Sequence, residues 1–366
     1  MIAQIQPDGT ARYFDIRKLT PTECFRLMGV PEAAIEKLTS RPDLLGKTAL
    51  YKLAGNSIVC DVLFYIYKNI WAYTPSPADT SQLSLFGGAP WQYEQPRGKP
   101  VRVVTLCSGY DSQCLALDML KDWMQRQGRT FDWNLMAWSE YDPEHPRTPL
   151  ERQPAVVAHN LLFPQYADRN VGDMTKADWA FLSNADIDLL TYSTPCQSIS
   201  LAGKREGIAR GSGTRSAVLW YTENAIATMR PKFLLQENVA ALVNKTNLPD
   251  FNEWCRTVER LGYTNYIQVL NAKDYGVPQN RERVFMLSVC DDLHLPEYRF
   301  PRPFKLTNAV ADLLDEEIDT DFLLKSESTI KFLQRNEKES CIYRVTDRKF
   351  TQDEIEAILH GTARAH

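Results

Sequence analysis

A single cysteine stands directly after a predicted buried strand, in the stretch Thr194-Pro195-Cys196-Gln197. An isolated cysteine usually fills a small space in a protein core, and that interpretation stays open for Cys196. A thiolate is nevertheless a strong nucleophile, and a strand end in an α/β sheet faces the ligand site. Glu237 follows the next predicted strand and would place a carboxylate beside the thiol. These residue types favour a nucleophilic cysteine.

A loop that carries glycine, serine and basic residues follows the cysteine at 198–215. Its composition indicates mobility, and its place beside the nucleophile makes it a candidate lid. Its basic side chains are Lys204, Arg205, Arg210 and Arg215. For any one of them, the alternative is a solvated charge with no further role.

Short apolar runs alternate with helical patterns from residue 101 onward. The predicted strands are 101–106, 134–138, 188–192, 233–236, 263–270 and 284–289, and the predicted helices are 112–126, 155–161, 216–229 and 251–261. Strands that alternate with helices indicate an α/β fold with a doubly wound, mostly parallel, Rossmann-like sheet. Such sheets bind ligands at the carboxyl ends of their strands, which is where the chemical motifs fall.

Composition divides the chain into four parts. Residues 72–100 are rich in proline, glycine and serine, which predicts a flexible linker. The part before it, 1–71, includes an apolar helix predicted over 58–71, which Asn56 or Ser57 could cap. A catalytic domain is predicted over 101–299, and a charged tail follows over 300–366.

The bulk properties exclude few classes of protein. The chain has 366 residues, of which 44% are apolar and 24% charged, with a net charge of −4. This balance supports a sizeable core and neither requires nor forbids nucleic acid. The eight cysteines form no Cys-x-x-Cys pair and the five histidines show no zinc spacing, so we expect no metal. With no signal peptide and no long apolar run in view, we expect a cytosolic protein with reduced thiols.

Five motifs together resemble those of a DNA (cytosine-5) methyltransferase. They are Arg17-x-Leu19-Thr20-x-x-Glu23, Gly55-Asn56-Ser57, Pro195-Cys196-Gln197, Glu237-Asn238-Val239 and Gln279-Asn280-Arg281-Glu282-Arg283. Each is weak alone, but all five fall on suitable elements. The resemblance implies the fold of the class I S-adenosylmethionine-dependent methyltransferases, with a small target-recognition domain.

The resemblance also implies a catalytic mechanism. Cys196 would add to C6 of cytosine, so that C5 can take the methyl group of S-adenosylmethionine. Glu237 would contact N3 and the exocyclic amine, while Arg281 and Arg283 would hold O2. The alternatives are an exposed acid at a strand end and a surface cluster of ion pairs.

A base inside a double helix is out of reach, so the cytosine must flip out of double-stranded DNA. The loop 198–215 would then close on the DNA, bringing its basic groups to backbone phosphates. The expected DNA-contacting residues are Gln197, Ser200, Lys204, Arg205, Arg210, Arg215 and Gln279.

For the cofactor, Glu140 lies just past the second predicted strand, where an acid would accept from ribose hydroxyls as in dinucleotide-binding folds, and Tyr141 beside it could stack on adenine. The resemblance assigns Asp173 to the adenine amine. The other expected cofactor-binding residues are Asn56, Ser57, Ser108, Gly109 and Pro195. The family usually has a phenylalanine and a glycine-rich turn after the first strand. This chain keeps Gly109 but has Cys107 in place of the aromatic residue, which weakens the expectation at this turn.

The order of the motifs is unusual. In most family members the Arg-x-Leu-Thr and Gly-Asn-Ser motifs come last, whereas here they lie at 17–23 and 55–57. The sequence therefore looks circularly permuted, with residues 72–100 joining the family's usual ends. Residues 1–16 and 300–366 would then meet and form the target-recognition segment.

The predicted linker contains Gln82-Leu83-Ser84-Leu85-Phe86, which resembles the peptide by which bacterial replication proteins dock on the sliding clamp. Tethered peptides of this kind insert apolar anchors into a pocket. The alternative, held equally, is that these apolar side chains pin the linker to its own domain.

Two other functions stay open. One is a catalytically impaired, DNA-binding relative; the other is an RNA cytosine methyltransferase that acts on tRNA. A thiol hydrolase fits poorly, because no histidine lies near a catalytic motif in the sequence. We expect a monomer of bacterial or phage origin.

Overall fold

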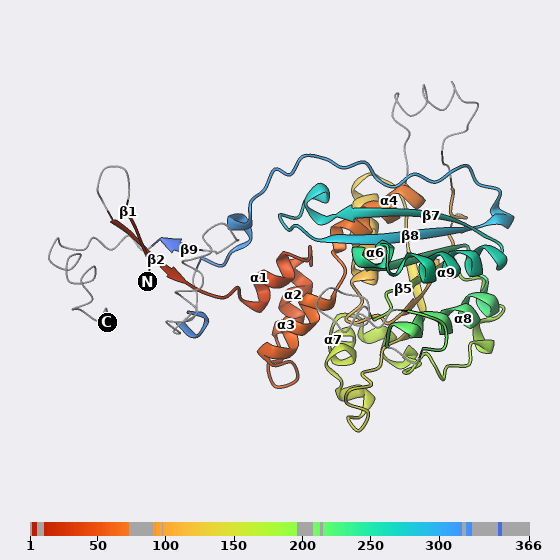
Figure 1. Cartoon of the computed structure of the whole chain (residues 1–366), viewed down its shortest axis with the longest axis horizontal. Helices are drawn as coiled ribbons and strands as arrows, with labels where there is room; N and C mark the ends of the chain where they lie inside the picture. The colour runs from red at the N-terminus through yellow and green to blue at the C-terminus, as the bar shows by residue number, and fades with distance from the viewer. Residues whose placement is uncertain are drawn as a thin grey trace, which may run out of the picture. The chain divides into compact units, whose positions relative to one another are not determined.

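The computed structural model describes residues 2–5, 11–72, 91, 93–96, 98–195, 208–212, 215–316, 320–323 and 343–345. The chain forms two compact units (Figure 1). The larger unit spans residues 24–313, and the smaller one joins residues 1–23 to residues 314–366. The two ends of the chain therefore belong to the same unit.

A six-stranded sheet of order β4-β3-β5-β6-β8-β7 forms the centre of the larger unit. β3 (Val101–Leu106) pairs in parallel with β4 (Trp133–Ser139) and β5 (Leu189–Tyr192), and β5 pairs in parallel with β6 (Phe233–Val239). β8 (Glu282–Cys290) runs antiparallel to both β6 and β7 (Tyr263–Asn271). The carboxyl ends of β3 to β6 therefore meet at one edge of the sheet.

Helices precede, connect and follow these strands. The α-helices are α1 (Pro21–Arg26), α2 (Glu32–Thr39), α3 (Lys47–Asn56), α4 (Cys60–Trp71), α6 (Ser112–Arg126), α7 (Pro154–Leu162), α8 (Thr222–Met229) and α9 (Leu248–Arg260). The short 3-10 helices are η1 (Leu150–Arg152), η2 (Pro164–Arg169), η3 (Ala180–Leu182), η4 (Arg215–Tyr221), η5 (Ala240–Val243), η6 (Ala272–Tyr275), η7 (Asp291–Leu293), η8 (Val310–Leu313) and η9 (Thr320–Phe322).

Both faces of the sheet are covered. Successive side chains of a strand point to opposite faces. Val103 and Leu189 belong to a core that includes α4, α6 and α7, whereas Val104 and Leu190 belong to a second core with α8 and α9. The predicted doubly wound, mostly parallel α/β sheet is therefore confirmed.

Several predicted element bounds need correction. β6 continues to Val239, so Glu237 lies within the strand and not after it. The predicted helix 216–229 begins as the 3-10 helix η4 and becomes α-helical only at Thr222. Trp91, inside the predicted linker, is 5% exposed and its ring packs on Phe233. The carboxyl end of that segment thus belongs to the core.

The first half of the chain supplies a stretch, 47–71, that is long and apolar enough to cross a bilayer by length and composition. It is interrupted, since α3 ends at Asn56 and α4 begins at Cys60. The prediction that Asn56 or Ser57 caps the following helix is therefore wrong. Ser57 instead donates its backbone N–H and its hydroxyl to Ala54 O, at the end of α3. Apolar residues of this stretch pack in the core of the protein; Leu63, for example, is fully buried.

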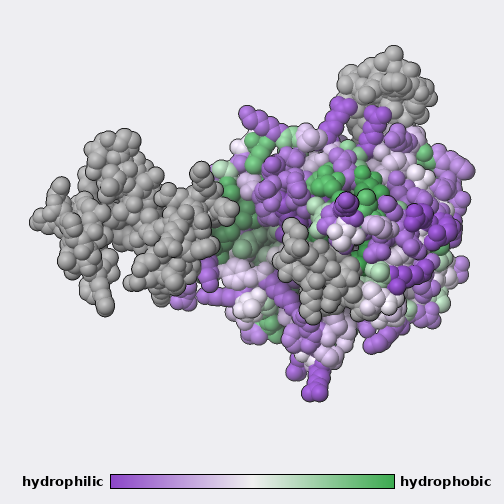
Figure 2. Space-filling view, in the orientation of Figure 1, coloured by the Kyte–Doolittle hydropathy of each residue, from purple (hydrophilic) through white to green (hydrophobic). Residues whose placement is uncertain are grey.

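β7 is the last described strand at its end of the sheet, and it carries exposed apolar side chains. Ile267 is 45% and Val269 is 41% exposed. Figure 2 shows hydrophobic surface, in green, over the region where β7 and β8 lie in Figure 1. The site described below lies at the ends of other strands, so this face takes no part in it.

In the smaller unit, β2 (Ala11–Ile16) pairs antiparallel with β1 (Ile2–Ile5) and with β9 (Tyr343–Val345). Phe14, for example, is opposite Ile2 on one side and Val345 on the other. A strand near the beginning of the chain is thus paired with one near its end.

The motif at 17–23 forms a capping box at the start of α1. Thr20 N donates to Glu23 Oε2 at 2.7 Å, and Glu23 N donates to Thr20 Oγ1 at 3.1 Å. Both guanidinium ends of Arg17 donate to the buried Glu23 carboxylate at 2.7 Å, and Asp315 N adds a further bond. Pro21 takes the first helical position, where its missing N–H costs nothing. This motif therefore has a structural explanation.

Candidate functional site

A cavity of about 470 Å³ lies at the carboxyl ends of β3, β4, β5 and β6, next to the end of α3. It brings together every predicted catalytic and cofactor-binding residue that the structure describes. These are Asn56, Ser57, Ser108, Gly109, Glu140, Tyr141, Asp173, Pro195, Glu237, Arg281 and Arg283. Cys196 lies outside the described residues. Sequence positions from 56 to 283 thus converge on one site.

The turn after β3 forms one wall. Cys107, Gly109 and Asp111 all have positive φ, which L residues rarely adopt, so the turn is tightly constrained. Asp111 caps α6 by accepting from Cys114 N, and Thr105 Oγ1 donates to its carboxylate at 2.8 Å. Burial raises the pKa of the Cys107 thiol far above its usual range, so this cysteine stays neutral. The turn therefore presents backbone groups and no ionised thiol.

Glu140, just past β4, faces this turn. Its Oε2 accepts from Gly109 N at 2.7 Å, while its own N donates to Asn170 Oδ1. Burial raises the pKa of Glu140 to about 7. The hydrogen bond from Gly109 lowers this pKa, whereas the negative charge of Asp142 raises it further. A carboxylate held in this way can accept hydrogen bonds from paired ribose hydroxyls, which fits an adenosine-containing cofactor.

Cofactor binding should depend on pH through Glu140. Only the carboxylate form accepts from two hydroxyls, and this form is lost as pH falls below the raised pKa of about 7. We expect the Kd of S-adenosylhomocysteine to be about tenfold higher at pH 6 than at pH 8, because one pH unit below a pKa leaves about a tenth ionised. Calorimetry at the two pH values measures this.

The matched control is Glu140→Gln, which cannot ionise. Its affinity should be weaker at pH 8 but nearly the same at both pH values. Equal affinity of the unaltered protein at pH 6 and pH 8 would contradict the assigned role of Glu140.

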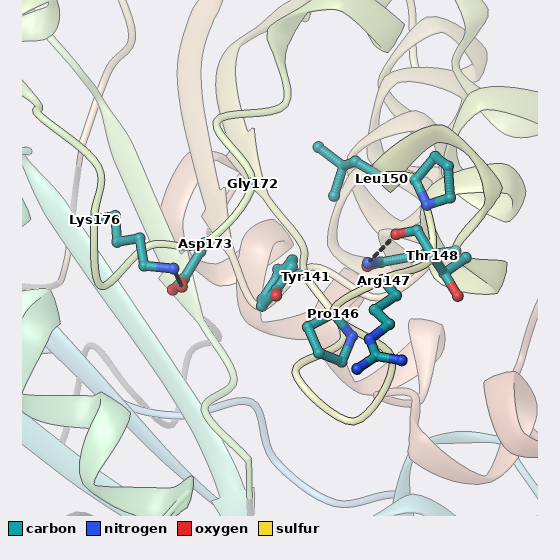
Figure 3. Close-up of a pocket in the computed structure, with 10 residues that line it drawn as sticks. Tyr141, Pro146, Arg147, Thr148, Leu150, Gly172, Asp173 and Lys176 are labelled. Carbon is teal, nitrogen blue, oxygen red and sulfur yellow. Dashed lines mark hydrogen bonds and ion pairs between the residues drawn. The ribbon is translucent and has the colours of Figure 1, made fainter.

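Tyr141 lines both this cavity and a second one of about 370 Å³. Figure 3 shows its ring between the Asp173–Lys176 ion pair on one side and Pro146 and Arg147 on the other. Asp173 Oδ1 accepts from Thr175, and its Oδ2 lies 3.1 Å from Lys176 Nζ. An aromatic face beside a fixed carboxylate suits a purine ring and its amine.

Glu237 lies on the opposite wall, near the end of β6, with 6% of its surface exposed. Its Oε2 accepts from Ser193 Oγ at 2.7 Å, and its Oε1 lies 3.1 Å from Arg283 Nε. Burial raises the pKa of Glu237, and it outweighs the lowering effects of Arg283 and Ser193. The raised pKa favours a carboxyl group that can give a proton to a bound ring.

The two carbonyls that precede Cys196 are both held in place. Asn238 Nδ2 donates to Thr194 O at 3.1 Å, and Ser216 Oγ donates to Pro195 O at 2.6 Å. Asn238 and Ser216 are buried. The backbone leading to Cys196 is therefore fixed from β6 on one side and from η4 on the other.

Removal of the Ser216 hydroxyl should slow catalysis without weakening cofactor binding. In Ser216→Ala the Pro195 carbonyl loses its buried partner, which costs about 1–3 kcal/mol locally and lets the segment that leads to Cys196 shift. We expect kcat for methyl transfer to fall roughly tenfold, with the cofactor Kd unchanged. Ser216→Thr, which keeps the hydroxyl, is the control; equal kcat in the wild type and the alanine variant would refute the positioning role.

Sequence reasoning identified Asn238 as part of a motif but missed Ser193 and Ser216. Ser193 lies before the cysteine segment in the chain and Ser216 lies after it. An isolated serine cannot be distinguished in the sequence from the many other serines. Gln153 was also missed. It is buried and lines the cavity, and its Oε1 accepts a hydrogen bond from Asp142 N at 2.7 Å, which restrains the loop after β4.

The predicted DNA-contacting loop is described only in part. Gln197, Ser200, Lys204 and Arg205 lie outside the described residues, as does the side chain of Arg215, whose backbone starts η4. Arg210 pairs with Glu223, and its guanidinium carbon lies 5.0 Å from the centre of the Trp220 ring. Gln279 Nε2 donates to Leu27 O at 2.8 Å. Arg210 and Gln279 thus already have protein partners.

The sequence matches the family described as C-5 cytosine-specific DNA methylase over residues 2–72 and 105–363. The two matched segments cover most of the chain. This chain belongs to the C-5 cytosine-specific DNA methylase family. The motifs at Pro195, Glu237 and Arg283 lie within the second segment, and Asn56 and Ser57 lie within the first.

Curated relatives support the same assignment to the cytosine methylases. The Type II methyltransferase M2.ScrFI of Lactococcus lactis subsp. cremoris is 43% identical over 159 residues, 43% of each chain. The orphan methyltransferase M.SssI of Spiroplasma monobiae is 43% identical over 146 residues, 38% of this chain and 37% of that one. The match thus spans less than half the length of either relative. The solved structure of the S. pombe Dnmt2 methyltransferase aligns with 65% of this chain and 67% of its own, at 19% identity and a TM-score of 0.43.

Proposed function

We propose that this cytosine methylase transfers a methyl group from S-adenosylmethionine to C5 of a flipped-out cytosine in double-stranded DNA. The observation that carries the proposal is the shared cavity. Glu140 and Asp173 line it on the cofactor side, Glu237 and Arg283 on the base side, and Pro195 lies beside the nucleophile. A methyl donor and a pyrimidine ring need such adjacent subsites.

The residues present fit the cofactor. The Glu140 carboxylate would accept the ribose hydroxyls, Tyr141 would stack on adenine and Asp173 would accept from the adenine amine. When bound, S-adenosylmethionine supplies the electrophilic methyl group. The rest of the chemistry belongs to the chain's own side chains.

Cys196 acts as a thiolate that forms a bond to C6 of the cytosine ring. Glu237, whose pKa is raised by burial, gives a proton to N3, where the electron pair that the addition releases is taken up. Arg283 lies against Glu237 and offers its remaining donors to O2. C5 would then take the methyl group as S-adenosylhomocysteine leaves. Water would accept the C5 proton, N3 would return its proton to Glu237, and the bond from C6 to sulfur would break, which restores the ring and the thiolate.

The base must leave the double helix to reach this cavity, because a stacked cytosine exposes neither face of C6. Unstacking costs a few kcal/mol, which contacts to the displaced strand and its phosphates offset. The loop 198–215, with Lys204 and Arg205, is proposed to supply some of these contacts and to exclude water on closing.

Transfer of tritium from labelled S-adenosylmethionine tests the proposal. Duplex DNA free of 5-methylcytosine and unmodified tRNA are offered in parallel, and the labelled product is identified after digestion to nucleosides. Label in 5-methyldeoxycytidine supports the proposal; label only in 5-methylcytidine assigns the enzyme to tRNA. Cofactor binding with label in neither nucleic acid would indicate the catalytically impaired relative.

We further propose that the chain is circularly permuted relative to its family. The two-segment family match, with its break at 73–104, supports this, as does the pairing of β2 with β9. A collinear comparison of a permuted chain can align only one segment, which fits the matched shares of about two-fifths. A variant that joins residue 366 to residue 1 and opens the chain within 73–90 should retain cofactor affinity; complete loss of folding in that variant would contradict the proposal.

Residues 82–86, which lie outside the described residues, are proposed as a docking peptide for the sliding clamp. The support is the sequence Gln82-Leu83-Ser84-Leu85-Phe86 and its place between the two matched segments. A pull-down with purified clamp tests this. Equal binding by the wild type and by Leu85→Ala/Phe86→Ala would refute it.

A further inference from the structure

Arg281 contacts a distant part of the chain. Its Nη2 donates to Gly55 O at 2.9 Å and to Ser57 O at 2.8 Å. These two carbonyls belong to the last turn of α3 and the residue after it, more than 220 positions earlier in the sequence. The contact therefore joins the amino-terminal segment to the segment that leads into β8.

The end of α3 needs such a partner. The last carbonyls of a helix lack bonding partners within the helix and carry the negative end of its dipole. α3 has no basic side chain in its last turn. Ser57 satisfies Ala54 O, and Arg281 satisfies the carbonyls of Gly55 and Ser57. Arg281 thus supplies from another segment the cation that a helix end usually carries in its own sequence.

The wall that Arg281 holds is part of the cofactor cavity. Gly55, Asn56, Ser57 and Ile58 all line it, as does Glu140. Charge-assisted hydrogen bonds to two carbonyls in one turn restrict the backbone there. A loosened turn would lower the affinity for a ligand that packs against it, because binding would have to order the turn again.

The neighbouring side chains of the same motif point to other partners. Gln279 donates to Leu27 O just beyond α1, and Arg283 lies against Glu237. Alternate residues of 279–283 therefore contact the amino-terminal segment twice and the catalytic carboxyl once. Arg283 is the arginine placed to meet the base, whereas Arg281 donates from Nη2 to the carbonyls of the cofactor wall and its charge also lowers the pKa of Glu237.

We propose that Arg281 is a positioning residue that holds the Gly55–Ile58 wall of the cofactor cavity, and that it does not bind the O2 atom of cytosine. This inference rests on the proposed function, since it takes S-adenosylmethionine as the ligand. It changes the role that the motif alone predicts for Arg281.

The test compares Arg281→Ala and Arg281→Lys with the matched control Gln279→Ala, which removes the other tie to the amino-terminal segment and does not line the cavity. Calorimetry with S-adenosylhomocysteine, without DNA, gives the Kd. We expect Arg281→Ala to raise Kd about tenfold, and Arg281→Lys and Gln279→Ala to stay within about threefold of wild type. At saturating cofactor, the rate of Arg281→Ala should recover to within about threefold of wild type, which separates a loss of cofactor affinity from a loss of kcat.

Hydrogen exchange gives a second readout that does not depend on the ligand. In Arg281→Ala the amides of residues 55–58 should exchange faster, with those of α9 unchanged as an internal reference for folding. If the alanine variant does not fold, Arg281→Met takes its place, because it keeps the aliphatic stem, removes both hydrogen bonds and should show the same rise in Kd and in exchange.

Two results would overturn the inference. One is an unchanged cofactor Kd in Arg281→Ala together with unchanged exchange at 55–58. The other is a large loss of kcat with cofactor binding intact, which would place Arg281 on the base. A wild type that binds no cofactor would instead refute the proposed function, so the two failures are distinguishable.

Discussion

Replacement of Cys196 by alanine should lower methyl transfer to DNA by at least about 10³-fold, because in the proposed mechanism the Cys196 thiolate forms the bond to C6 that activates C5. The Kd of S-adenosylhomocysteine should change by less than about threefold, since the described cofactor-side residues do not include the thiol. Initial rates with tritiated cofactor and unmethylated duplex DNA measure the first value, and calorimetry measures the second.

The matched control for this prediction is Cys107→Ala. Cys107 also lines the cavity, but its pKa is raised by burial and its sulfur lies 3.5 Å from that of Met174. A neutral thiol packed in this way is not a nucleophile. Its loss should reduce the rate by less than about tenfold. If Cys107→Ala abolished transfer and Cys196→Ala did not, the nucleophile would be assigned wrongly.

Replacement of Glu237 by glutamine should lower kcat about 10²- to 10³-fold, within the range for loss of a general acid. Glutamine keeps the volume and can still bond Ser193 and Arg283, but it has no proton to give to N3. Because burial raises the pKa of Glu237, the protonated form persists to higher pH than for a free carboxyl group. kcat of the unaltered enzyme should therefore decline as pH rises through that raised pKa.

The pH profile distinguishes a proton donor from a structural acid. In Glu237→Gln the decline of kcat toward high pH should disappear, leaving a low and flat profile. A variant with the same pH dependence as the wild type, or with kcat within about threefold of it, would contradict the role of Glu237.

Much of the central sheet could be predicted from the sequence. β3 and α6 have the bounds expected from an apolar run and from the helical pattern that follows it. The extension of β6 to Val239 could not be foreseen, because glutamate and asparagine are poor strand formers. The pairing of Glu237 with Phe285 and of Asn238 with Val284 keeps them in the strand. Tertiary pairing thus overrode local preference.

The cap assigned to Asn56 failed for a related reason. The pattern over 47–56 does not stand out in sequence, so the polar residues at its end were interpreted as the start of the next helix. In the structure, Asn56 ends α3 and Arg281 holds the turn. The spacing of residues along the sequence cannot predict a contact between Arg281 and Ser57, because the two lie so far apart in the chain.

The candidate site was predictable where a motif marked it and not elsewhere. Glu140 was predicted from its place after a strand, and Asp173 and Glu237 from the resemblance; the structure places all three on one cavity. Ser193 and Ser216 each donate a side-chain hydrogen bond to those motifs. Such supporting residues depend on where other elements fold, which short-range sequence patterns do not record.

The measurement that tests the central claim most directly is covalent trapping on duplex DNA in which cytosine is replaced by 5-fluorocytosine. The fluorine at C5 cannot leave as a proton does, so the enzyme should remain bonded to C6 after methyl transfer. With S-adenosylmethionine present, we predict a denaturation-resistant adduct whose peptide map places the link at Cys196, and no adduct with Cys196→Ser. Cofactor binding and DNA methylation without any adduct, or an adduct that persists in Cys196→Ser, would contradict the account.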